Sequence, residues 1–354
     1  MLSHAQILIV RLSSIGDVLH ATTVAHNLKQ SYPHCHLTWI VSRTAAELLQ
    51  YNPDIDELFI WSREDFEQAL RQHQFGKVLH SIRLLKDFFS THSFDIALDI
   101  HGLFMSGIIT RLSKAPRRIG MSGTKELNWL FMNEFAAAPQ SPHKIMHYLS
   151  VLEAVKGNKQ DYHLILKLPT ALSGFAAKFF AQNQVDRKKK LLLVNPWTSW
   201  RSKNWGIKNF AQCLDQLPDT IEILLCGGPA DEENNKKIIA ATKRPLIDIT
   251  GKTRLLELAA LFTQTDLILT GDTGALHIAT ALKVSTISLW GPTRPEKYGP
   301  LVPGHTFICS ENACINCDKT KCRLQNNACM NSIPPNLVSE KIITALIKKS
   351  PSDC

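Results

Sequence analysis

The sequence predicts an α/β protein with two Rossmann-like, doubly wound domains that face a cleft. Short apolar runs typical of buried parallel strands alternate with stretches of helical spacing along most of the chain. At 354 residues the chain is longer than one core usually grows, so two domains are expected. In both halves polar turns follow the apolar runs, and open α/β sheets bind ligands at that edge.

The first half shows this alternation from its beginning. We expect strands at residues 6–11, 36–41, 55–60 and 94–100, and helices at 18–28, 45–50, 64–72 and 76–92. The turn after the first strand places Ser14, Gly16 and Asp17 at the edge of the sheet. It lacks the glycines of a dinucleotide site, which argues against nicotinamide chemistry. Asp17 is either a functional carboxylate or an ordinary helix cap, and both interpretations stay open.

A second polar turn, residues 99–102, follows the fourth strand and contains His101. Basic side chains are dense after it: Arg111, Lys114, Arg117, Arg118 and Lys125, then His143, Lys144 and His147. This region is either solvated surface or a landing site for an anionic acceptor.

We place the domain boundaries at 1–168, 169–335 and 336–354. Residues 162–168 are expected to form a strand, and the last segment a terminal helix whose apolar face could pack back on the first domain. The second domain should hold strands at 191–194, 221–226, 246–249, 267–270 and 285–289, and helices at 207–216, 231–241, 255–262 and 275–282.

Two strand-end loops of the second half suggest an anion site. The loop 195–205 offers Thr198 and Lys203, with Lys203 as a compact phosphate donor. Asp272-Thr273-Gly274 opens a helix whose free N–H groups can seat a phosphate, and His277 lies near the same end. The alternative is an ordinary βαβ unit with a capped helix.

Composition limits the partners. Lys and Arg total 40 against 31 Asp and Glu, which gives a net charge of +9 and suggests an acidic partner. No apolar run is long enough for a membrane span or a secretory signal, so we expect a cytoplasmic protein. The basic residues are not interleaved with aromatic stacking platforms, which disfavours nucleic acid.

Four cysteines gather near the end of the chain: Cys314, Cys317, Cys322 and Cys329. The first two have a metal-ligand spacing, but the following gaps of four and six residues are not the usual two-knuckle pattern. A structural zinc or iron site and a set of reduced, packed cysteines both remain open.

Four stretches, in order, resemble the family 9 glycosyltransferases, the lipopolysaccharide heptosyltransferases. They are Arg11-Leu-Ser-Ser-Ile-Gly-Asp17, Asp99-Ile-His-Gly102 with Arg117-Arg-Ile-Gly120, Lys203-Asn-Trp205, and Asp272-Thr-Gly-x-x-His277 before Gly291-Pro-Thr293. The resemblance extends to about Pro335 and implies the two-domain GT-B fold. The chain departs from the family at His101, where glutamine is frequent, and at Lys125-Glu126, where enzymes adding the first heptose have arginine and glutamate.

The resemblance implies an inverting transfer of L-glycero-D-manno-heptose from ADP-heptose to a Kdo residue of the lipopolysaccharide inner core. The enzyme would act from the cytoplasm, peripherally on the inner face of the inner membrane, on a Kdo-lipid A type acceptor. Alternatives are transfer to a later core sugar or to a protein hydroxyl, and a non-catalytic sugar-nucleotide-binding protein.

The resemblance also implies roles for individual residues, with no cofactor or divalent metal required. Asp17 and Lys203 would be catalytic. Donor-binding residues would be Thr198, Lys203, Asp272, Thr273, Gly274 and His277, and acceptor-binding residues Ser14, Gly16, His101, Arg117, Arg118 and Lys125. Asp17 would act as the base, with either a late proton transfer in a concerted displacement or a raised pKa in the closed cleft.

Overall fold

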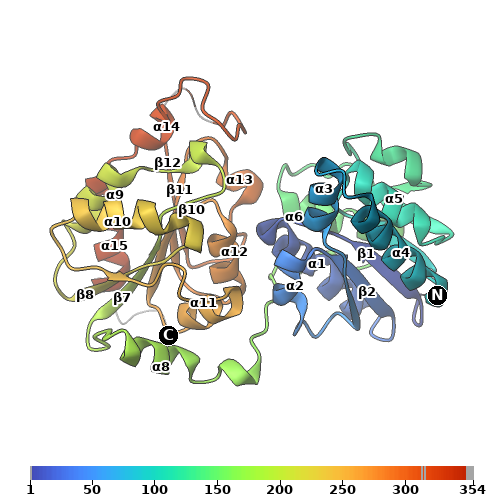
Figure 1. Cartoon of the computed structure of the whole chain (residues 1–354), viewed down its shortest axis with the longest axis horizontal. Coiled ribbons are helices and arrows are strands. Elements are labelled where there is room, and N and C mark those ends of the chain that lie inside the picture. The colour runs from blue at the N-terminus through green and yellow to red at the C-terminus, as the bar shows by residue number, and fades with distance from the viewer. Residues whose placement is uncertain (1, 312–313, 315, 348–354) are drawn as a thin grey trace. The chain divides into compact units, whose positions relative to one another are not determined.

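The computed structural model describes residues 2–311, 314 and 316–347, and the chain divides into two compact units between Lys167 and Leu168 (Figure 1). Each unit is a six-stranded sheet with helices on both faces, and every strand pairing is parallel. The predicted α/β, doubly wound class is therefore confirmed.

The sheet of the first unit has the order β3-β2-β1-β4-β5-β6. Its strands are β1 (Gln6–Val10), β2 (His36–Val41), β3 (Glu57–Ile60), β4 (Ile96–Asp99), β5 (Arg117–Gly120) and β6 (Glu134–Phe135). The strand order reverses between β1 and β4, which makes this pair the topological switch point, where open α/β sheets bind ligands.

The sheet of the second unit has the order β12-β11-β10-β7-β8-β9. Its strands are β7 (Lys190–Asn195), β8 (Ile221–Leu225), β9 (Ile247–Asp248), β10 (Leu267–Gly271), β11 (Thr286–Trp290) and β12 (His305–Cys309). Counted from the start of the unit, this order repeats that of the first sheet, and its switch point lies between β7 and β10.

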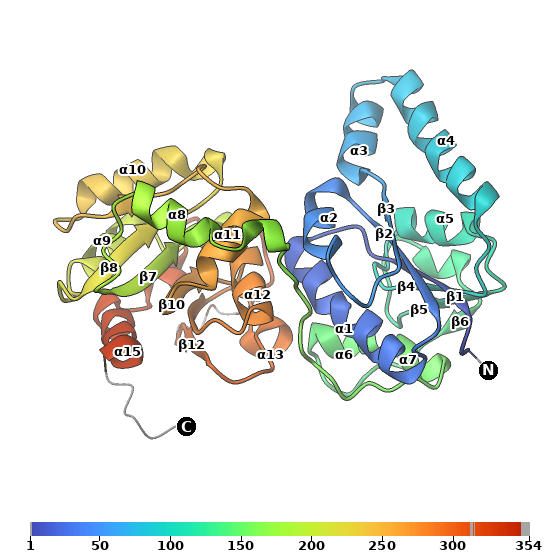
Figure 2. The same cartoon turned by 90° about the horizontal axis from the view of Figure 1, so that it is seen from below.

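The first unit covers its sheet with α1 (Ile15–Ser31), α2 (Arg43–Leu49), α3 (Arg63–Arg71), α4 (Phe75–Thr91), α5 (Phe104–Leu112), α6 (Lys144–Leu149), α7 (Val151–Ala154) and the 3₁₀ turn η1 (Asn128–Phe131). Figure 2 shows α3 and α4 side by side, projecting beyond the sheet. One core layer joins Leu8, Val10 and Ile40 of the sheet to Phe88 and Phe89 of α4.

The second unit contains α8 (Phe175–Gln182), α9 (Ile207–Leu214), α10 (Glu232–Ala241), α11 (Leu255–Phe262), α12 (Gly274–Ala281), α13 (Pro295–Tyr298), α14 (Ala328–Asn331), α15 (Pro335–Ile347) and the 3₁₀ turns η2 (Thr170–Leu172), η3 (Arg201–Lys203) and η4 (Pro229–Asp231). The terminal helix α15 buries Val338, Ile342 and Leu346 in the core of this same unit, with Leu214 of α9. The expectation that it packs back on the first domain is therefore wrong.

Residues 162–168 form no strand. Their segment runs extended beside α1, where Ile165 N donates to Thr22 Oγ1 at 2.9 Å and Asn27 Nδ2 donates to the Asp161 carbonyl at 2.8 Å. Side chains of a helix therefore take the place of a partner strand.

Within the described residues, no helix is both long and apolar enough to cross a membrane.

Candidate active site

The switch point of the first unit gathers the polar turns after β1 and β4. Arg11 follows β1, Asp17 lies in the first turn of α1, and His101 follows β4. Ser14 occupies the cap position of α1, but its hydroxyl does not cap the helix; it donates to Asp17 Oδ2 at 3.0 Å. Gly16 lies in the same helical turn. Four predicted residues therefore lie at one edge of one sheet.

Asp17 is held by two strong donors. Arg11 Nη2 lies 2.7 Å from Asp17 Oδ2, and Tyr148 Oη donates to Oδ1 at 2.5 Å. Arg11 is itself buried, donates from Nη1 to the Ile100 carbonyl at 2.9 Å, and lies over the Tyr148 ring at 5.1 Å from its centroid. This network leaves Asp17 in one defined orientation, which is more than a helix cap needs.

The electrostatic surroundings of Asp17 favour its charged form. Burial raises the pKa of the carboxyl, but the Arg11 charge and the Tyr148 hydrogen bond outweigh burial, and His20 and Lys144 act in the same direction. The pKa of Asp17 is consequently well below its usual range. In this structure the pKa of Asp17 is lowered, which is compatible with a late proton transfer, and a raised pKa in the closed cleft stays a prediction.

His101 is buried and neutral. Burial lowers the pKa of its imidazole to about 3, with further lowering by Arg11 and Arg63. Its Nε2 lies 3.2 Å from Arg63 Nη1, so the neutral ring can accept a hydrogen bond from α3. The backbone N–H groups of His101 and Gly102 both donate to Asp99 Oδ1 at 2.9 Å, which fixes the turn.

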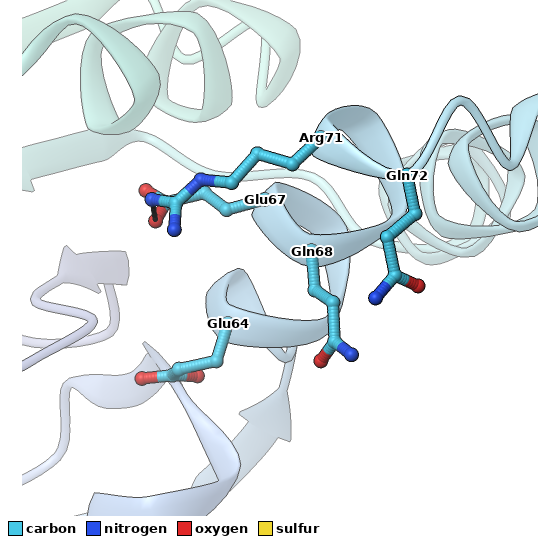
Figure 3. A pocket seen from close by; sticks show the side chains of 5 residues that line it. All are labelled: Glu64, Glu67, Gln68, Arg71 and Gln72. Carbon is cyan, nitrogen blue, oxygen red and sulfur yellow. Dashed lines mark ion pairs between the residues drawn. The ribbon is translucent and has the colours of Figure 1, made fainter.

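Arg63 reaches His101 from the start of α3, where Glu67 Oε1 accepts from Arg63 Nε at 2.6 Å. Glu67 also pairs with Arg71 at 3.6 Å (Figure 3). This face of α3 carries a hollow of about 440 Å³, lined by Glu64, Glu67, Gln68, Arg71 and Gln72. Four of these side chains come from α3, Gln72 directly follows that helix, and none of the five was predicted to bind a substrate, so we assign no substrate to the hollow.

The structure does not bring Arg117 and Arg118 to this edge. They begin β5 and pair in register with Ile96 and Ala97, at the opposite end of the sheet from the turn after β4. Arg117 binds both carboxylate oxygens of Glu134 at 2.7 Å, and Arg118 donates to the carbonyls of Phe131 and Ala115 at 2.9 and 2.8 Å. The two guanidiniums hold β5 and its neighbours together, so the structure does not bring them to the edge where Asp17 lies, and their acceptor role stays a prediction.

Lys125 does lie near the predicted site. Its backbone N–H donates to the Gly102 carbonyl at 3.2 Å, and its side chain is exposed. Gly102 has a φ of +74°, and a Cβ there would lie 3.1 Å from Thr124 Cγ2. Only glycine therefore lets the loop of Lys125 approach the turn so closely.

The switch point of the second unit joins the loops after β7 and β10. Lys203 Nζ lies 2.7 Å from Asp272 Oδ2, and Thr293 Oγ1 donates to the same oxygen at 2.7 Å. The ammonium also lies 4.1 Å from the ring centroid of Trp200. Lys203 and Asp272 are both nearly buried, so the pair is shielded from water.

The helix α12 starts directly beside this pair. Thr273 occupies the cap position without a side-chain capping bond, and Gly274 is the first helical residue. His277 is buried in the same helix, with Nε2 3.9 Å from Asp272 Oδ1. Thr198 packs against the end of β10, where a Cβ on Gly271 would lie 3.1 Å from Thr198 Cγ2. All six predicted donor residues therefore gather at one edge.

A cation beside a helix N-terminus is suited to binding an anion. The helix start presents N–H groups and the positive end of the helix dipole. Lys203 already pairs with Asp272, so a phosphate would have to share the ammonium; its three N–H donors allow this. Such a site can stabilise the charge on a departing diphosphate.

Four cysteines, Cys314, Cys317, Cys322 and Cys329, line one cavity of about 50 Å³ together with Ser202 and Pro292. In the part of the chain that the structure describes, no group of three or more His, Cys, Asp or Glu side chains is already arranged to hold a metal ion.

Sequence reasoning missed the residues that orient the predicted ones. The sequence does contain an indication for Arg11, because a cation at the end of an apolar strand needs a buried partner. The same kind of indication exists for Asp99, a charged residue at the end of β4. The sequence contains no indication for Tyr148, because it lies 131 residues from Asp17 and only the fold brings the two together.

Comparison with known proteins adds independent findings. Residues 82–328 match the family described as Glycosyltransferase family 9 (heptosyltransferase). The chain is 31% identical over 297 residues to the lipopolysaccharide core heptosyltransferase OpsX of Haemophilus influenzae, covering 82% of this chain and 80% of that protein. A family 9 glycosyl transferase structure from Veillonella parvula has a TM-score of 0.81 at 21% identity, covering 98% of this chain and 99% of that one. The E. coli heptosyltransferase WaaC with ADP has a TM-score of 0.74 at 20% identity, covering 96% and 99%.

Proposed function

The chain belongs to glycosyltransferase family 9, and from that premise we propose that it transfers L-glycero-D-manno-heptose from ADP-heptose to a Kdo residue of the lipopolysaccharide inner core. The observation that carries the proposal is the Lys203–Asp272–Thr293 cluster at the start of α12. It offers a shielded cation and helix N–H groups to one anion, as an enzyme whose leaving group is a diphosphate needs.

The donor diphosphate is assigned to this edge of the second unit. Lys203 and the N–H groups at Thr273 and Gly274 bind the phosphates and neutralise the charge that develops as ADP leaves. His277 supports the same helix end. This charge stabilisation comes from groups of the chain itself, so the proposed mechanism includes no metal ion.

Asp17 is assigned as the base. The acceptor hydroxyl oxygen attacks the anomeric carbon, the bond from that carbon to the diphosphate oxygen breaks, and the hydroxyl proton passes to Asp17. Attack opposite the leaving group inverts the anomeric centre. Because the pKa of Asp17 is held low, its carboxylate is a weak base, and the proton moves late, when the attacking oxygen has become acidic.

The acceptor is assigned to the turns around Asp17. Ser14, Gly16, His101 and Lys125 lie there, and the exposed Lys125 ammonium suits a Kdo carboxylate. The net charge of +9 favours a peripheral position on an anionic membrane surface, which on the cytoplasmic side is the inner leaflet. Transfer to a later core sugar or to a protein hydroxyl would use the same base and donor site.

The test is incubation of the chain with ADP- and UDP-sugars and three acceptors: Kdo-lipid A, a heptosylated Kdo-lipid A and an unmodified protein. Mass spectrometry of the products should show one added heptose on Kdo-lipid A, from ADP-heptose alone. NMR of the product should show an anomeric configuration opposite to that of the donor. Transfer only to the heptosylated lipid or to protein would replace the Kdo assignment, and no transfer to any acceptor would contradict the proposal.

A further inference from the structure

The helices α3 and α4 form a hairpin that extends past the carboxyl edge of the first sheet. Only residues 92–95 separate the end of α4 from β4, so α4 ends at the amino end of that strand and begins toward its carboxyl end. A helix of 17 residues spans about 25 Å, whereas a strand of five or six residues spans about 17 to 20 Å. The first turns of α4 therefore project beyond the sheet, as Figure 2 shows.

The tip of this α3–α4 hairpin exposes large apolar side chains. Phe75 is 68% exposed and Leu79 is 66% exposed, and Leu70 at the end of α3 is also exposed. Phe75 and Leu79 are four residues apart, so they lie on one face of α4. Further along, α4 buries Phe88 and Phe89 in the core. The projecting end of the helix, and not its packed end, therefore presents an apolar face to the outside.

A second exposed apolar group lies at the same edge, in and just before the turn η1. Leu127, Trp129 and Leu130 are each more than half exposed. Asn128 between them is buried, and its Nδ2 donates to the Leu103 carbonyl at 2.8 Å, in the turn after β4. This hydrogen bond holds η1 against the start of α5, so its apolar side chains are kept at the carboxyl edge of the sheet.

The hairpin tip is also basic. Between Glu67 and Asp87, residues 68–86 contain four exposed cations and no carboxylate: Arg71, Lys77, Arg83 and Lys86. Arg83 and Lys86 follow Leu79 by four and seven residues, so they lie on the same face of α4, nearer the sheet. An apolar helix end with cations behind it suits a bilayer, where apolar side chains enter by about 5–10 Å and cations stay with the phosphates.

We propose that this edge of the first unit docks on an anionic lipid bilayer through the tip of the α3–α4 hairpin and the η1 turn. Phe75, Leu79 and Trp129 enter the region between headgroups and acyl chains, where aromatic side chains are favoured. The four cations of the tip bind lipid phosphates. A protein partner fits this surface less well, because lysine is depleted at protein interfaces.

The docking surface lies at the edge that carries the candidate acceptor turns. Asp17 lies in the helix turn that follows β1, and His101 follows β4, both at the carboxyl ends of these strands. Docking therefore brings these turns to the lipid surface, where the headgroup of a lipid-linked acceptor lies. This consequence rests on the proposed function and identifies the surface for its peripheral position; bilayer binding itself does not depend on the reaction.

The first experiment measures sedimentation of the full chain with vesicles that contain no sugar acceptor. The chain should bind vesicles of equal parts phosphatidylglycerol and phosphatidylcholine, and bind pure phosphatidylcholine at least about tenfold more weakly, since several cations face the lipid. Phe75→Ser with Leu79→Ser should weaken binding at least about tenfold, because two apolar side chains no longer leave water. The matched control, Leu301→Ser with Ile347→Ser, changes two exposed apolar residues of the second unit and should bind normally.

The charge contribution is measured in the same assay. Arg83→Gln with Lys86→Gln should weaken binding to the anionic vesicles on the order of tenfold, and added salt should weaken binding of the unmodified chain. Lys208→Gln with Lys237→Gln removes the same charge from exposed positions of the second unit and should have little effect. An equal loss in both variants would show that the overall charge binds the lipid, and would overturn the assigned surface.

Contact of η1 with lipid is read by fluorescence. Trp129 is exposed, whereas the other six of the seven tryptophans are buried or half-buried. Vesicles with brominated acyl chains should quench the tryptophan emission of the unmodified chain, and Trp129→Phe should remove most of that quenching. Quenching that is unchanged in Trp129→Phe would remove η1 from the docking surface.

Two results would overturn bilayer docking as a whole: no binding of the unmodified chain to the anionic vesicles, or unchanged binding by folded Phe75→Ser with Leu79→Ser. Self-association of the chain without lipid, abolished by the same two substitutions, would show that the tip docks on a second copy instead. The substituted side chains are exposed in the unmodified chain, and circular dichroism checks that the variants fold.

The second experiment separates docking from the reaction. Phe75→Ser with Leu79→Ser should slow transfer to Kdo-lipid A in vesicles about tenfold, and leave transfer to a deacylated, water-soluble acceptor unchanged. Equal slowing with both acceptors would contradict a role in docking. If neither acceptor is modified by the unmodified chain, the proposed function fails, while vesicle binding still decides the docking surface.

Discussion

The two switch points have the same topology and opposite chemistry. At the first, a carboxylate is the central group, and Arg11 and Tyr148 surround Asp17 with donors. At the second, a cation is the central group, and Asp272 holds Lys203 beside the start of α12. Both pairs lie where the strand order of a doubly wound sheet reverses.

This difference indicates that the fold determines where each site lies, at the reversal of the strand order, whereas the side chains determine the chemistry of the site. A carboxylate kept ionised among donors can take a proton but cannot bind a diphosphate, because like charges repel. A lysine at a helix N-terminus can bind a diphosphate but, as an ammonium ion, has no lone pair to accept a proton. The comparison predicts that damage to one switch point changes turnover and damage to the other changes donor binding.

The largest expected effect comes from Asp17→Asn, which keeps the shape of the side chain and removes its charge. We expect kcat to fall by about a thousandfold, since a positioned general base contributes on this scale. Steady-state kinetics with ADP-heptose and Kdo-lipid A measure it. Asp87→Asn, an exposed carboxylate on α4, is the matched control and should keep normal turnover. Normal turnover by a folded Asp17→Asn variant would remove the base assignment.

Lys203→Ala should have the next largest effect. Its loss removes the nearly buried cation that we assign to the donor diphosphate and leaves Asp272 without its ion-pair partner. We expect kcat/KM to fall on the order of 100-fold, as for the loss of one preorganised charge-stabilising donor. Lys203→Arg should recover only part of this, because a planar fork does not replace a compact ammonium.

The control for Lys203→Ala is Lys208→Ala, an exposed lysine on α9 that should change neither KM nor kcat. If both lysine variants lowered kcat/KM equally, the effect would reflect the overall charge of the chain and not the site.

Tyr148→Phe should have the smallest effect on kcat/KM at neutral pH and the clearest effect on the pH dependence of the rate. Removal of a hydrogen bond to a charged group should raise the pKa of Asp17 by about one unit. Both forms of the enzyme stay ionised at pH 7, so kcat/KM should fall only about threefold there, through lost orientation. The acid limb of the pH–rate profile should move to higher pH, and an unmoved limb would show that the limb does not report Asp17.

The same substitution has a predicted effect on stability. The pKa of Asp17 is lower in the folded chain than its usual value of 3.8, so this group stabilises the fold above that pH. The contribution is lost as the pH falls below 3.8 toward the folded-state pKa. Tyr148→Phe should therefore be less stable than the unmodified chain at pH 7, and the deficit should shrink in acid, as denaturant unfolding at several pH values can measure.

The sequence was sufficient for the elements whose apolar pattern is local. The apolar runs at β1 and β10 have the pattern of buried strands. The polar turns that follow these two strands supply Asp17 and Asp272. The strand β5 was missed because it begins with Arg117 and Arg118, whose charges face Glu134 and backbone carbonyls. The same charges were the reason for predicting that Arg117 and Arg118 bind the acceptor, although the structure places them away from the turn that holds His101.

Other features could not be predicted because they depend on contacts distant in the sequence. Tyr148 meets Asp17 only after α6 packs on α1. Lys203 was expected to face a ligand, and nothing local indicates that Asp272 pairs with it across 69 residues. The lowered pKa of Asp17 in this structure also depends on Arg11 and Tyr148, and the sequence alone does not show the contact with Tyr148.

The most direct test of the central claim is calorimetric binding of ADP-heptose to Asp17→Asn and Lys203→Ala, measured side by side with the unmodified chain. If the first unit supplies the base and the second holds the donor, Asp17→Asn will bind with a Kd within about threefold of the unmodified value, and Lys203→Ala will bind at least about tenfold more weakly. Loss of donor affinity in Asp17→Asn, with affinity preserved in Lys203→Ala, would contradict the claim.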